Sequence, residues 1–313
     1  MRILVTGGAG FIGSHLAKRL LEAGHKVIVV DDLSTGSRDN VPEGAELLVL
    51  DLSRPESLSR LPDDVAAVCH LAAQSAGAVS AEQPYYDLMA NAGSTLLLSR
   101  WCLERGIGRF VYASSMAVYG DEVESPVGED ARCVPKSYYG ASKLAAEHVL
   151  RLAAPEGLNV TVFRIFTAYG PGQNLRNLKQ GMVSIYLAYL LRGVAVPVTG
   201  SLDRFRDLIY VDDVVEAWRR AVETRATPRL VYNLGTGRGT TVRELLQALA
   251  RACDLPADHP VEELPGSPSD QFGLFADVSA VSFDLDVAPP TRLEDGLQRM
   301  VSWATAGSGT PSA

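Results

Sequence analysis

A glycine-rich segment near the N-terminus constrains the fold more than any other part of this sequence. Residues 2–6 form an apolar run that predicts a strand, residues 7–13 read GGAGFIG, and residues 14–21 have the apolar periodicity of a helix. Glycine permits a tight turn and a close approach of the backbone to a pyrophosphate, and the helix start offers free N–H groups to phosphates. Between a strand and a helix, and followed by an acidic residue (Asp31) at the end of the next strand, the pattern predicts a dinucleotide site.

Strand-like and helical segments alternate through the first half of the chain. This alternation predicts an α/β fold of the Rossmann type, a doubly wound parallel sheet that binds ligands at the carboxyl ends of its strands. The predicted strands after the first are Lys26–Asp31, Glu46–Leu50, Val65–Leu71, Arg109–Ser114 and Asn159–Phe166. The predicted helices are Ser14–Ala23, Gln83–Arg105 and Ser137–Leu152.

The second half of the chain breaks this pattern at residues 169–173, YGPGQ. We expect a smaller domain here, interleaved with returns to the first one. Its expected elements are the helix Met182–Leu191, the helix Val211–Glu223, the run Val231–Gly237 and the helix Thr241–Ala252. Residues 305–313 are small and polar, which predicts a flexible tail.

Composition restricts the class of protein. The chain has 313 residues, is 47% hydrophobic and carries a net charge of −8, which argues against nucleic acid or an anionic membrane as its main partner. Its four cysteines lie far apart in the sequence, as in proteins of a reducing compartment, and its histidines lack metal-ligand spacing. With no apparent signal peptide or membrane span, we expect a cytoplasmic protein without a metal site.

The residues that follow the second and third strands indicate which dinucleotide is bound. Asp31 can accept hydrogen bonds from both ribose hydroxyls and would repel a 2′-phosphate, which favours NAD over NADP. Asp32 and Arg38 leave NADP open as an alternative, because an arginine at position 38 could hold the 2′-phosphate. Asp51 and Leu52, at the end of the third strand, are placed to flank the adenine.

A tyrosine and a lysine in the helix 137–152 suggest proton-transfer chemistry. Tyr139 and Lys143 lie one turn apart on the same helical face, whereas Tyr138 is rotated by about 100°. A nearby ammonium group stabilises a phenolate, so we expect Lys143 to lower the pKa of Tyr139 toward the operating pH. Such a tyrosine can remove a proton from a sugar hydroxyl while hydride leaves the carbon beneath it.

A family resemblance rests on motifs distributed along almost the whole chain: TGGAGFIGSHL (6–16), HLAA (70–73), SSMAVYG (114–120), YGASK (139–143), YGPGQ (169–173), DRFRDLIYVDDVVEA (203–217) and YNLGTG (232–237). Together they resemble the extended short-chain dehydrogenase/reductase superfamily, in particular its NAD-dependent nucleotide-sugar epimerase/dehydratase group and the UDP-glucose (UDP-galactose) 4-epimerases within it. The resemblance implies an NAD-binding Rossmann domain at 1–168 with returns near 207–236. It also implies a nucleotide-sugar-binding domain at 169–206 and 237–304, and a homodimer built from the helices 83–105 and 137–152.

The resemblance also implies roles for individual residues. Tyr139 is the expected acid/base, Lys143 the contact to the nicotinamide ribose and Ser115 the partner of the reacting oxygen. The expected cofactor-binding residues, besides Tyr139 and Lys143, are Gly7, Gly10, Phe11, Ile12, Gly13, Asp31, Asp32, Asp51, Leu52, Leu71, Ala72, Ala73 and Asn91. The expected substrate-binding residues are Ser75, Ser115, Met116, Thr167, Gln180, Arg206 and Asp270. Of these, Arg206 matches the arginine that pairs with the nucleotide diphosphate.

The two residues that follow Ser115 favour one reaction over the others. Dehydratases of the family resemble T-D-E-V-Y-G here and decarboxylases T-S-E-V-Y-G, whereas this chain has Met116 and Ala117, which cannot move protons. The prediction is therefore a nucleotide-sugar 4-epimerase that oxidises C4 transiently, lets the 4-keto sugar rotate and returns the hydride.

Three further functions stay open, and the first is a UDP-glucuronate 4-epimerase. Thr167 stands where the family usually has asparagine, and a threonine there resembles the uronate 4-epimerases that act on UDP-glucuronate. Arg176, Lys179 or Gln180 could meet such an acidic sugar. The second is a net sugar-nucleotide reductase or dehydrogenase, and the third is a non-catalytic NAD-binding module.

Overall fold

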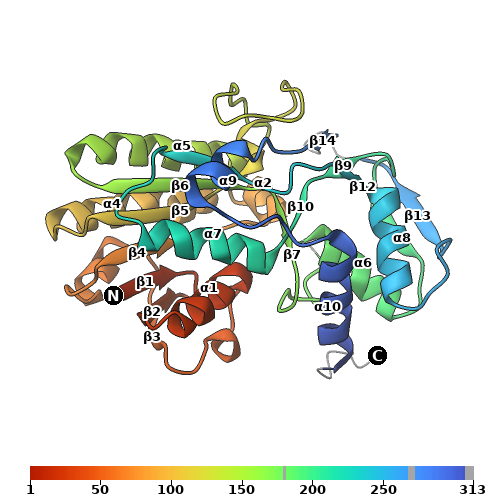
Figure 1. Cartoon of the computed structure of the whole chain (residues 1–313), viewed down its shortest axis with the longest axis horizontal. Helices are drawn as coiled ribbons and strands as arrows, with labels where there is room; N and C mark the ends of the chain where they lie inside the picture. The colour runs from red at the N-terminus through yellow and green to blue at the C-terminus, as the bar shows by residue number, and fades with distance from the viewer. Residues whose placement is uncertain (179–180, 267–271, 307–313) are drawn as a thin grey trace.

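The structure is a computed structural model that describes residues 1–178, 181–266 and 272–306. Within these residues, seven parallel strands form one sheet in the order β11-β6-β5-β4-β1-β2-β3 (Figure 1). The strand order reverses direction beside β1, as in a doubly wound fold, and this confirms the predicted fold class. The strands are β1 (Arg2–Thr6), β2 (Lys26–Asp31), β3 (Glu46–Val49), β4 (Ala67–His70), β5 (Arg109–Ser115), β6 (Asn159–Ile165) and β11 (Val231–Leu234).

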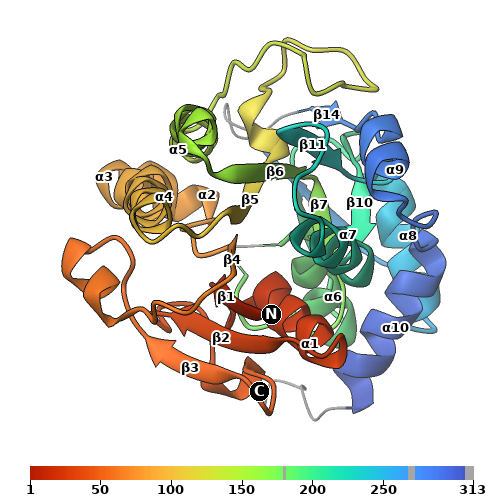
Figure 2. The same ribbon diagram turned by 60° about the vertical axis from the view of Figure 1, so that its left-hand side comes forward.

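Helices cover both faces of this sheet, as the continuous apolar strands require (Figure 2). On β1, Ile3 and Val5 belong to the core that contains α1 (Phe11–Glu22) and α7 (Val211–Glu223). The intervening Leu4 points to the opposite core, which contains α4 (Ser94–Glu104) and α5 (Tyr138–Ala153). The period of two along the strand therefore divides the hydrophobic core into two layers.

The helix predicted over 83–105 is present as one unbroken helical run over residues 84–104. It comprises α3 (Pro84–Leu88), a π-helical turn η3 (Met89–Gly93) and α4, and it is preceded by α2 (Gly77–Glu82), which the sequence analysis did not predict. Gln83 separates α2 from α3 with φ −133° and ψ 63°, because a residue before proline is driven out of the helical region. The π turn makes this segment wider than a regular helix, and such turns are frequent at functional sites.

The second half of the chain alternates between the sheet and a smaller set of elements. After β6 it forms β7 (Thr167–Tyr169) and α6 (Met182–Leu191), and it returns to the sheet through β10 (Leu208–Tyr210), α7 and β11. The smaller part lies at the right of Figure 1. Its elements are β8 (Val196–Thr199), β9 (Phe205–Arg206), β12 (Thr240–Thr241), α8 (Val242–Ala252), β13 (Val261–Leu264), β14 (Gly273–Leu274) and α10 (Leu293–Ala306), whereas α9 (Ser279–Leu285) packs against β11 and α7.

The predicted flexible tail begins too early in the sequence. α10 continues through Thr305 and Ala306, and residues 307–313 lie outside the described residues. The helix persists because Ala304 is buried against the core and the Thr305 hydroxyl donates to the carbonyl of Val301. None of the helices within the described ranges is long and apolar enough to cross a membrane.

Short helical turns complete the structure: η1 (Arg38–Asn40), η2 (Pro55–Arg60), η4 (Met116–Val118) and η5 (Ala154–Glu156). Two of them matter for the site, because η1 follows β2 and η4 follows β5 at the carboxyl edge of the sheet.

Candidate active site

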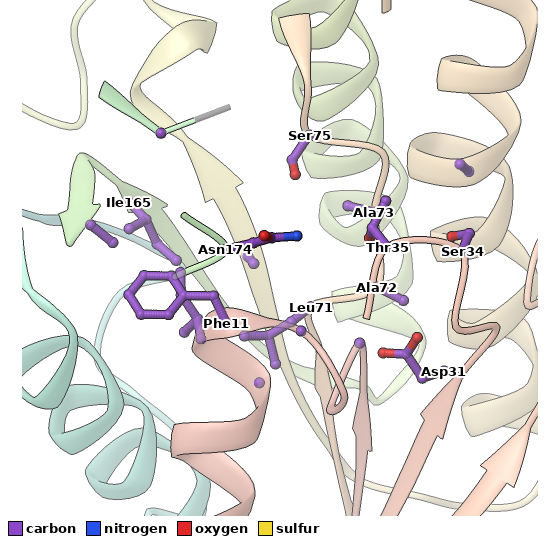
Figure 3. Close-up of a pocket in the computed structure, with 18 of the residues that line it drawn as sticks. Phe11, Asp31, Ser34, Thr35, Leu71, Ala72, Ala73, Ser75, Ile165 and Asn174 are labelled. Carbon is purple, nitrogen blue, oxygen red and sulfur yellow. The ribbon is translucent and has the colours of Figure 1, made fainter. Parts of the chain in front are cut away.

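A cavity of about 830 Å³ opens at the carboxyl ends of the parallel strands. Every predicted cofactor-binding residue except Asn91 lines it, and so do Ser75, Ser115, Met116 and Thr167. In the close-up of Figure 3, Asp31 and Ser34 lie on one side of the cavity, and Phe11 and Asn174 lie on the other. The topology thus brings residues from throughout the first half of the chain to one cavity.

The glycines form a backbone cradle that a side chain would fill. A Cβ on Gly13 would lie 2.1 Å from the carbonyl oxygen of Gly7, and a Cβ on Gly7 would lie 2.6 Å from the backbone nitrogen of Ala72. Gly7 also has a φ of +69°, which favours glycine. Gly10 caps α1 without any side-chain hydrogen bond, so the first N–H groups of this helix are available to an anion. These features fit a pyrophosphate.

Asp31 is held at the edge of the cavity by the backbone. Its two carboxylate oxygens accept hydrogen bonds from the N–H groups of Ala9, at 3.0 Å, and Leu33, at 2.9 Å. Burial raises the pKa of Asp31, and these two bonds oppose that shift. Asp32 accepts from the backbone and hydroxyl of Ser34 and so shapes the following loop. Arg38 is not among the residues that line the cavity, so the geometry does not offer it to a 2′-phosphate.

The catalytic residues predicted from the sequence come together on the wall formed by β5 and α5. Tyr139 and Ser115 both line the cavity, and the Ser115 oxygen accepts a hydrogen bond from the backbone N–H of Ala117 at 3.2 Å. Lys143 is buried, and its ammonium group donates to the carbonyl of Ala113 at 2.8 Å. Tyr138 is 60% exposed, as its rotation around the helix predicts.

The expectation that Lys143 lowers the pKa of Tyr139 is wrong for the protein in this state. Burial raises the pKa of Tyr139, the nearby Asp87 adds to that shift, and the hydrogen bond from Ser115 opposes it. Burial also lowers the pKa of Lys143 to about 7, although Asp87 and Glu147 act in the opposite direction. The lysine is therefore only partly protonated near neutral pH, and its positive charge stabilises the tyrosinate less than that of a fully protonated lysine would.

A buried ion pair fixes the catalytic helix to the sheet. Glu147 on α5 accepts from Nε of Arg164 at 3.0 Å and from Nη2 at 2.8 Å, and Ser114 donates to the same carboxylate at 2.5 Å. Both members of the pair are almost fully buried. Because Ser114 and Arg164 belong to β5 and β6, this cluster sets the position of Tyr139 relative to Ser115.

Several predicted residues lie elsewhere. Asn91 is buried outside the cavity, where its amide bonds the backbone of Gln74 and the hydroxyl of Ser142; Ala90, one residue earlier, lines the cavity in its place. Both residues belong to the π turn η3. Arg206 lies on β9 and does not line the cavity either; one of its contacts is to the carbonyl of Phe205. Gln180 and Asp270 lie outside the described residues.

The structure also adds residues that the sequence analysis missed. Ser34, Thr35, Ser37 and Asn40 line the cavity from the loop after β2; their polar composition was the only signal. Tyr86 and Trp303 also line it, from segments far apart in the sequence, and no local pattern identifies them.

The histidines do not form a metal site within the described ranges, where no group of three potential ligands is found. His70 is the most buried of them, with its two ring nitrogens bonded to the hydroxyls of Thr6 and Thr95. Its pKa is lowered to about 3 by burial, so it is a neutral structural residue that ties β1 to α4.

Comparison with known proteins agrees with this geometry. Residues 3–235 match the model of the NAD dependent epimerase/dehydratase family. A UDP-glucose 4-epimerase of Azospirillum brasilense is 34% identical over 322 aligned positions, which cover 96% of this chain and 91% of that protein.

Two solved structures are similar over nearly the full length. The UDP-glucose 4-epimerase of Thermotoga maritima, determined with UDP-glucose, superposes with a TM-score of 0.93 at 35% identity and covers 98% of this chain and 99% of that one. The UDP-glucose 4-epimerase of Thermus thermophilus, determined with NAD, gives a TM-score of 0.90 at 34% identity and covers 98% and 100%.

Proposed function

The chain belongs to the NAD-dependent epimerase/dehydratase family, and we propose that it is a 4-epimerase of nucleotide-linked hexoses, with UDP-hexoses as the substrate class. One observation carries the choice of reaction within the family. Tyr139 and Ser115 line the same cavity, while Met116, the residue after Ser115, presents a thioether where proton transfer for an elimination would need a carboxylate. The site can therefore support oxidation and reduction of an alcohol without loss of water.

The chain's own residues divide the work as follows. Tyr139 exchanges a proton with the sugar hydroxyl at C4, and Ser115 donates a hydrogen bond that stabilises charge on the tyrosine or on the substrate oxygen. Lys143, fixed by the carbonyl of Ala113, supplies a positive charge beneath the tyrosine when it is protonated. The glycine cradle and the start of α1 hold the pyrophosphate, and Asp31 binds the ribose of the adenosine. These residues would hold NAD, which would supply a reversible hydride acceptor for C4.

An epimerase also requires the oxidised sugar to present its other face. Thr167 and Ser75 line the cavity together with Tyr139 and Ser115, and their hydroxyl groups can donate to or accept from a sugar ring in either orientation. We infer that the 4-keto sugar rotates there while the nucleotide end stays bound.

UDP-glucuronate is the second candidate substrate. Thr167 and Arg176 both line the cavity, and an arginine can pair with the carboxylate of a uronate. Met116 and Ala117 do not distinguish a net dehydrogenase or reductase from an epimerase, whereas the nicotinamide absorbance does.

The proposal includes a homodimer located in the cytoplasm. Large apolar side chains are exposed on neighbouring helices on one side of the sheet, namely Tyr85 and Leu88 of α3, Leu96 of α4, and Tyr138 and Leu152 of α5 (Figure 2). A second copy of the chain would cover them in an isologous contact. The four cysteines are free, which agrees with a reducing compartment.

Purified protein incubated separately with UDP-glucose, UDP-GlcNAc and UDP-glucuronate tests the reaction and the substrate together. We expect the 4-epimer of one of these sugars on chromatographic separation, without net change in the nicotinamide absorbance. Stoichiometric formation of reduced cofactor would indicate a dehydrogenase instead. Unchanged substrates from NAD-loaded protein would contradict the proposal for UDP-sugars.

A further inference from the structure

Asp87 on α3 is a fully buried acidic residue with no role in the reaction described so far. One oxygen of its carboxylate accepts a hydrogen bond from the Ser142 hydroxyl at 2.5 Å, and the other accepts from the side-chain amide of Gln74 at 2.9 Å. A carboxylate that accepts at both oxygens is bonded as the ionised form is. Burying such a charge costs free energy unless the charge is hydrogen-bonded and paired with an opposite charge.

Hydrogen bonds connect Asp87 to two walls of the cavity. Gln74 lies between Ala73 and Ser75, which both line the cavity, and Ser142 immediately precedes Lys143. The amide of Asn91 closes the network, since it donates to the Ser142 oxygen at 2.9 Å and to the Gln74 carbonyl at 3.1 Å. Asp87 is therefore held at a fixed place beside the catalytic helix.

The other ionisable groups around the catalytic pair are either ion-paired or neutral. Glu147 on α5 also raises the pKa of Lys143, but its carboxylate forms an ion pair with Arg164 of β6. His70 of β4 and Tyr112 of β5 are uncharged near neutral pH, because burial lowers the pKa of the histidine to about 3 and raises that of the tyrosine.

Asp87, by contrast, forms no ion pair with any described arginine or lysine. Its negative charge instead acts on Lys143, whose pKa it raises, and on Tyr139, whose pKa it also raises.

We propose that Asp87 is a positioning residue whose buried charge favours the protonated forms of both Lys143 and Tyr139, and so sets the pH range in which the pair works. The catalytic part of this proposal rests on the proposed function, whereas the electrostatic part does not. Loss of the charge should move the ionisation of both Tyr139 and Lys143 to lower pH. An exclusively structural role, in which Asp87 only holds Gln74 and Ser142 in place, predicts no such displacement.

A spectroscopic titration tests the electrostatic part without any turnover. The ionisation of Tyr139 is obtained as the difference in tyrosinate absorbance between the protein and its Tyr139→Phe variant. The same difference is then measured in the Asp87→Asn background. We expect Tyr139 to ionise about one pH unit lower in the Asp87→Asn protein. Identical titrations in the two backgrounds would overturn the proposal.

Two matched variants separate charge from geometry. Ser142→Ala removes the hydrogen bond to Asp87 and keeps the charge, so the Tyr139 titration should stay within a few tenths of a unit of the parent. Asp63→Asn removes a carboxylate that is exposed at the surface and should change nothing. If Ser142→Ala displaces the titration as far as Asp87→Asn does, the effect is structural and the proposal fails.

The catalytic part is tested by the pH dependence of kcat/KM for the sugar nucleotide that is turned over. Both limbs of the profile should move to lower pH by about one unit in Asp87→Asn. Asp87→Ser, a smaller neutral replacement, gives the same comparison if the asparagine variant does not fold. A parent protein without epimerase activity but with a displaced Tyr139 titration contradicts the proposed function alone. An active parent with unmoved titration and profile contradicts the role of Asp87.

Discussion

The ammonium nitrogen of Lys143 lies 5.9 Å from the centroid of the Tyr139 ring and 5.0 Å from that of Tyr112. The lysine is thus placed between two aromatic rings and a backbone carbonyl, in a pocket that removes water from its charge. This placement explains why burial, more than the mutual attraction of the pair, sets the ionisation of both residues. It also makes the pair sensitive to buried charges in its surroundings.

Replacement of Tyr139 by phenylalanine should abolish turnover and leave cofactor binding intact. The ring is kept, so the cavity wall stays filled, but the proton carrier is lost, and we expect kcat to fall by about 10²–10⁴-fold. Product formation and the NAD content of the denatured protein provide the two measurements. Tyr138→Phe is the matched control, because this neighbouring tyrosine points to solvent. Appreciable activity in Tyr139→Phe would remove the tyrosine from the mechanism.

The pH dependence of the free enzyme should reflect the lysine. Since burial lowers the pKa of Lys143 to about 7, its ammonium form is lost as the pH rises above that value. We therefore expect kcat/KM to decline by about tenfold per pH unit on the alkaline side. Lys143→Arg retains its charge across this range, so its residual activity should lack the decline. A parent profile that stays flat well above neutrality would disprove this assignment.

Substitution of Gly13 by alanine should disrupt the cofactor site. The new Cβ would meet the carbonyl oxygen of Gly7 at 2.1 Å, which forces the turn and α1 apart. We expect lost NAD retention together with destabilisation of about 1–3 kcal/mol, read from bound nucleotide and from urea unfolding. Gly77→Ala is the control, since its Cβ meets nothing within 4 Å. Equal NAD content in the two variants would show that the cradle tolerates a side chain.

Asp31 should determine which dinucleotide is bound. Its two oxygens accept from backbone N–H groups, so Asp31→Asn keeps the size of the side chain, removes the charge and loses one of these two hydrogen bonds, because an amide nitrogen cannot accept. We expect weaker binding of NAD and a preference over NADP that is reduced by about tenfold or more, measured by titration of both cofactors. An unchanged preference would place the discrimination in another residue.

The Glu147–Arg164 pair should contribute strongly to stability. Glu147→Gln leaves the guanidinium of Arg164 buried without its counter-charge, and we expect the free energy of unfolding to fall by about 3 kcal/mol. Glu156→Gln breaks the exposed ion pair with Arg100, and should cost no more than about 1 kcal/mol. Urea denaturation of the two variants gives the comparison. Similar losses would mean that the buried pair is not the anchor of α5.

Local sequence patterns predicted most strands and helices of the sheet within one or two residues, because buried parallel strands and amphipathic helices have strong periodicities. The helix over residues 84–104 was predicted, whereas the π turn within it was not, because a π turn has no sequence pattern of its own. Ala90 and Asn91 both belong to this turn, and of the two only Ala90 lines the cavity.

The doubly wound fold, the NAD site and the grouping of Ser115, Tyr139 and Lys143 could all be predicted from sequence alone, because glycine spacing and helical phase are local properties of the chain. The pKa shifts of Tyr139 and Lys143, in contrast, became visible only in the folded structure. The pKa of Tyr139 depends on water excluded by surrounding elements and on Asp87, which is 52 positions away in the sequence, as counted from 87 to 139. Burial and through-space charge arise only when these segments pack together, so no local pattern could report them.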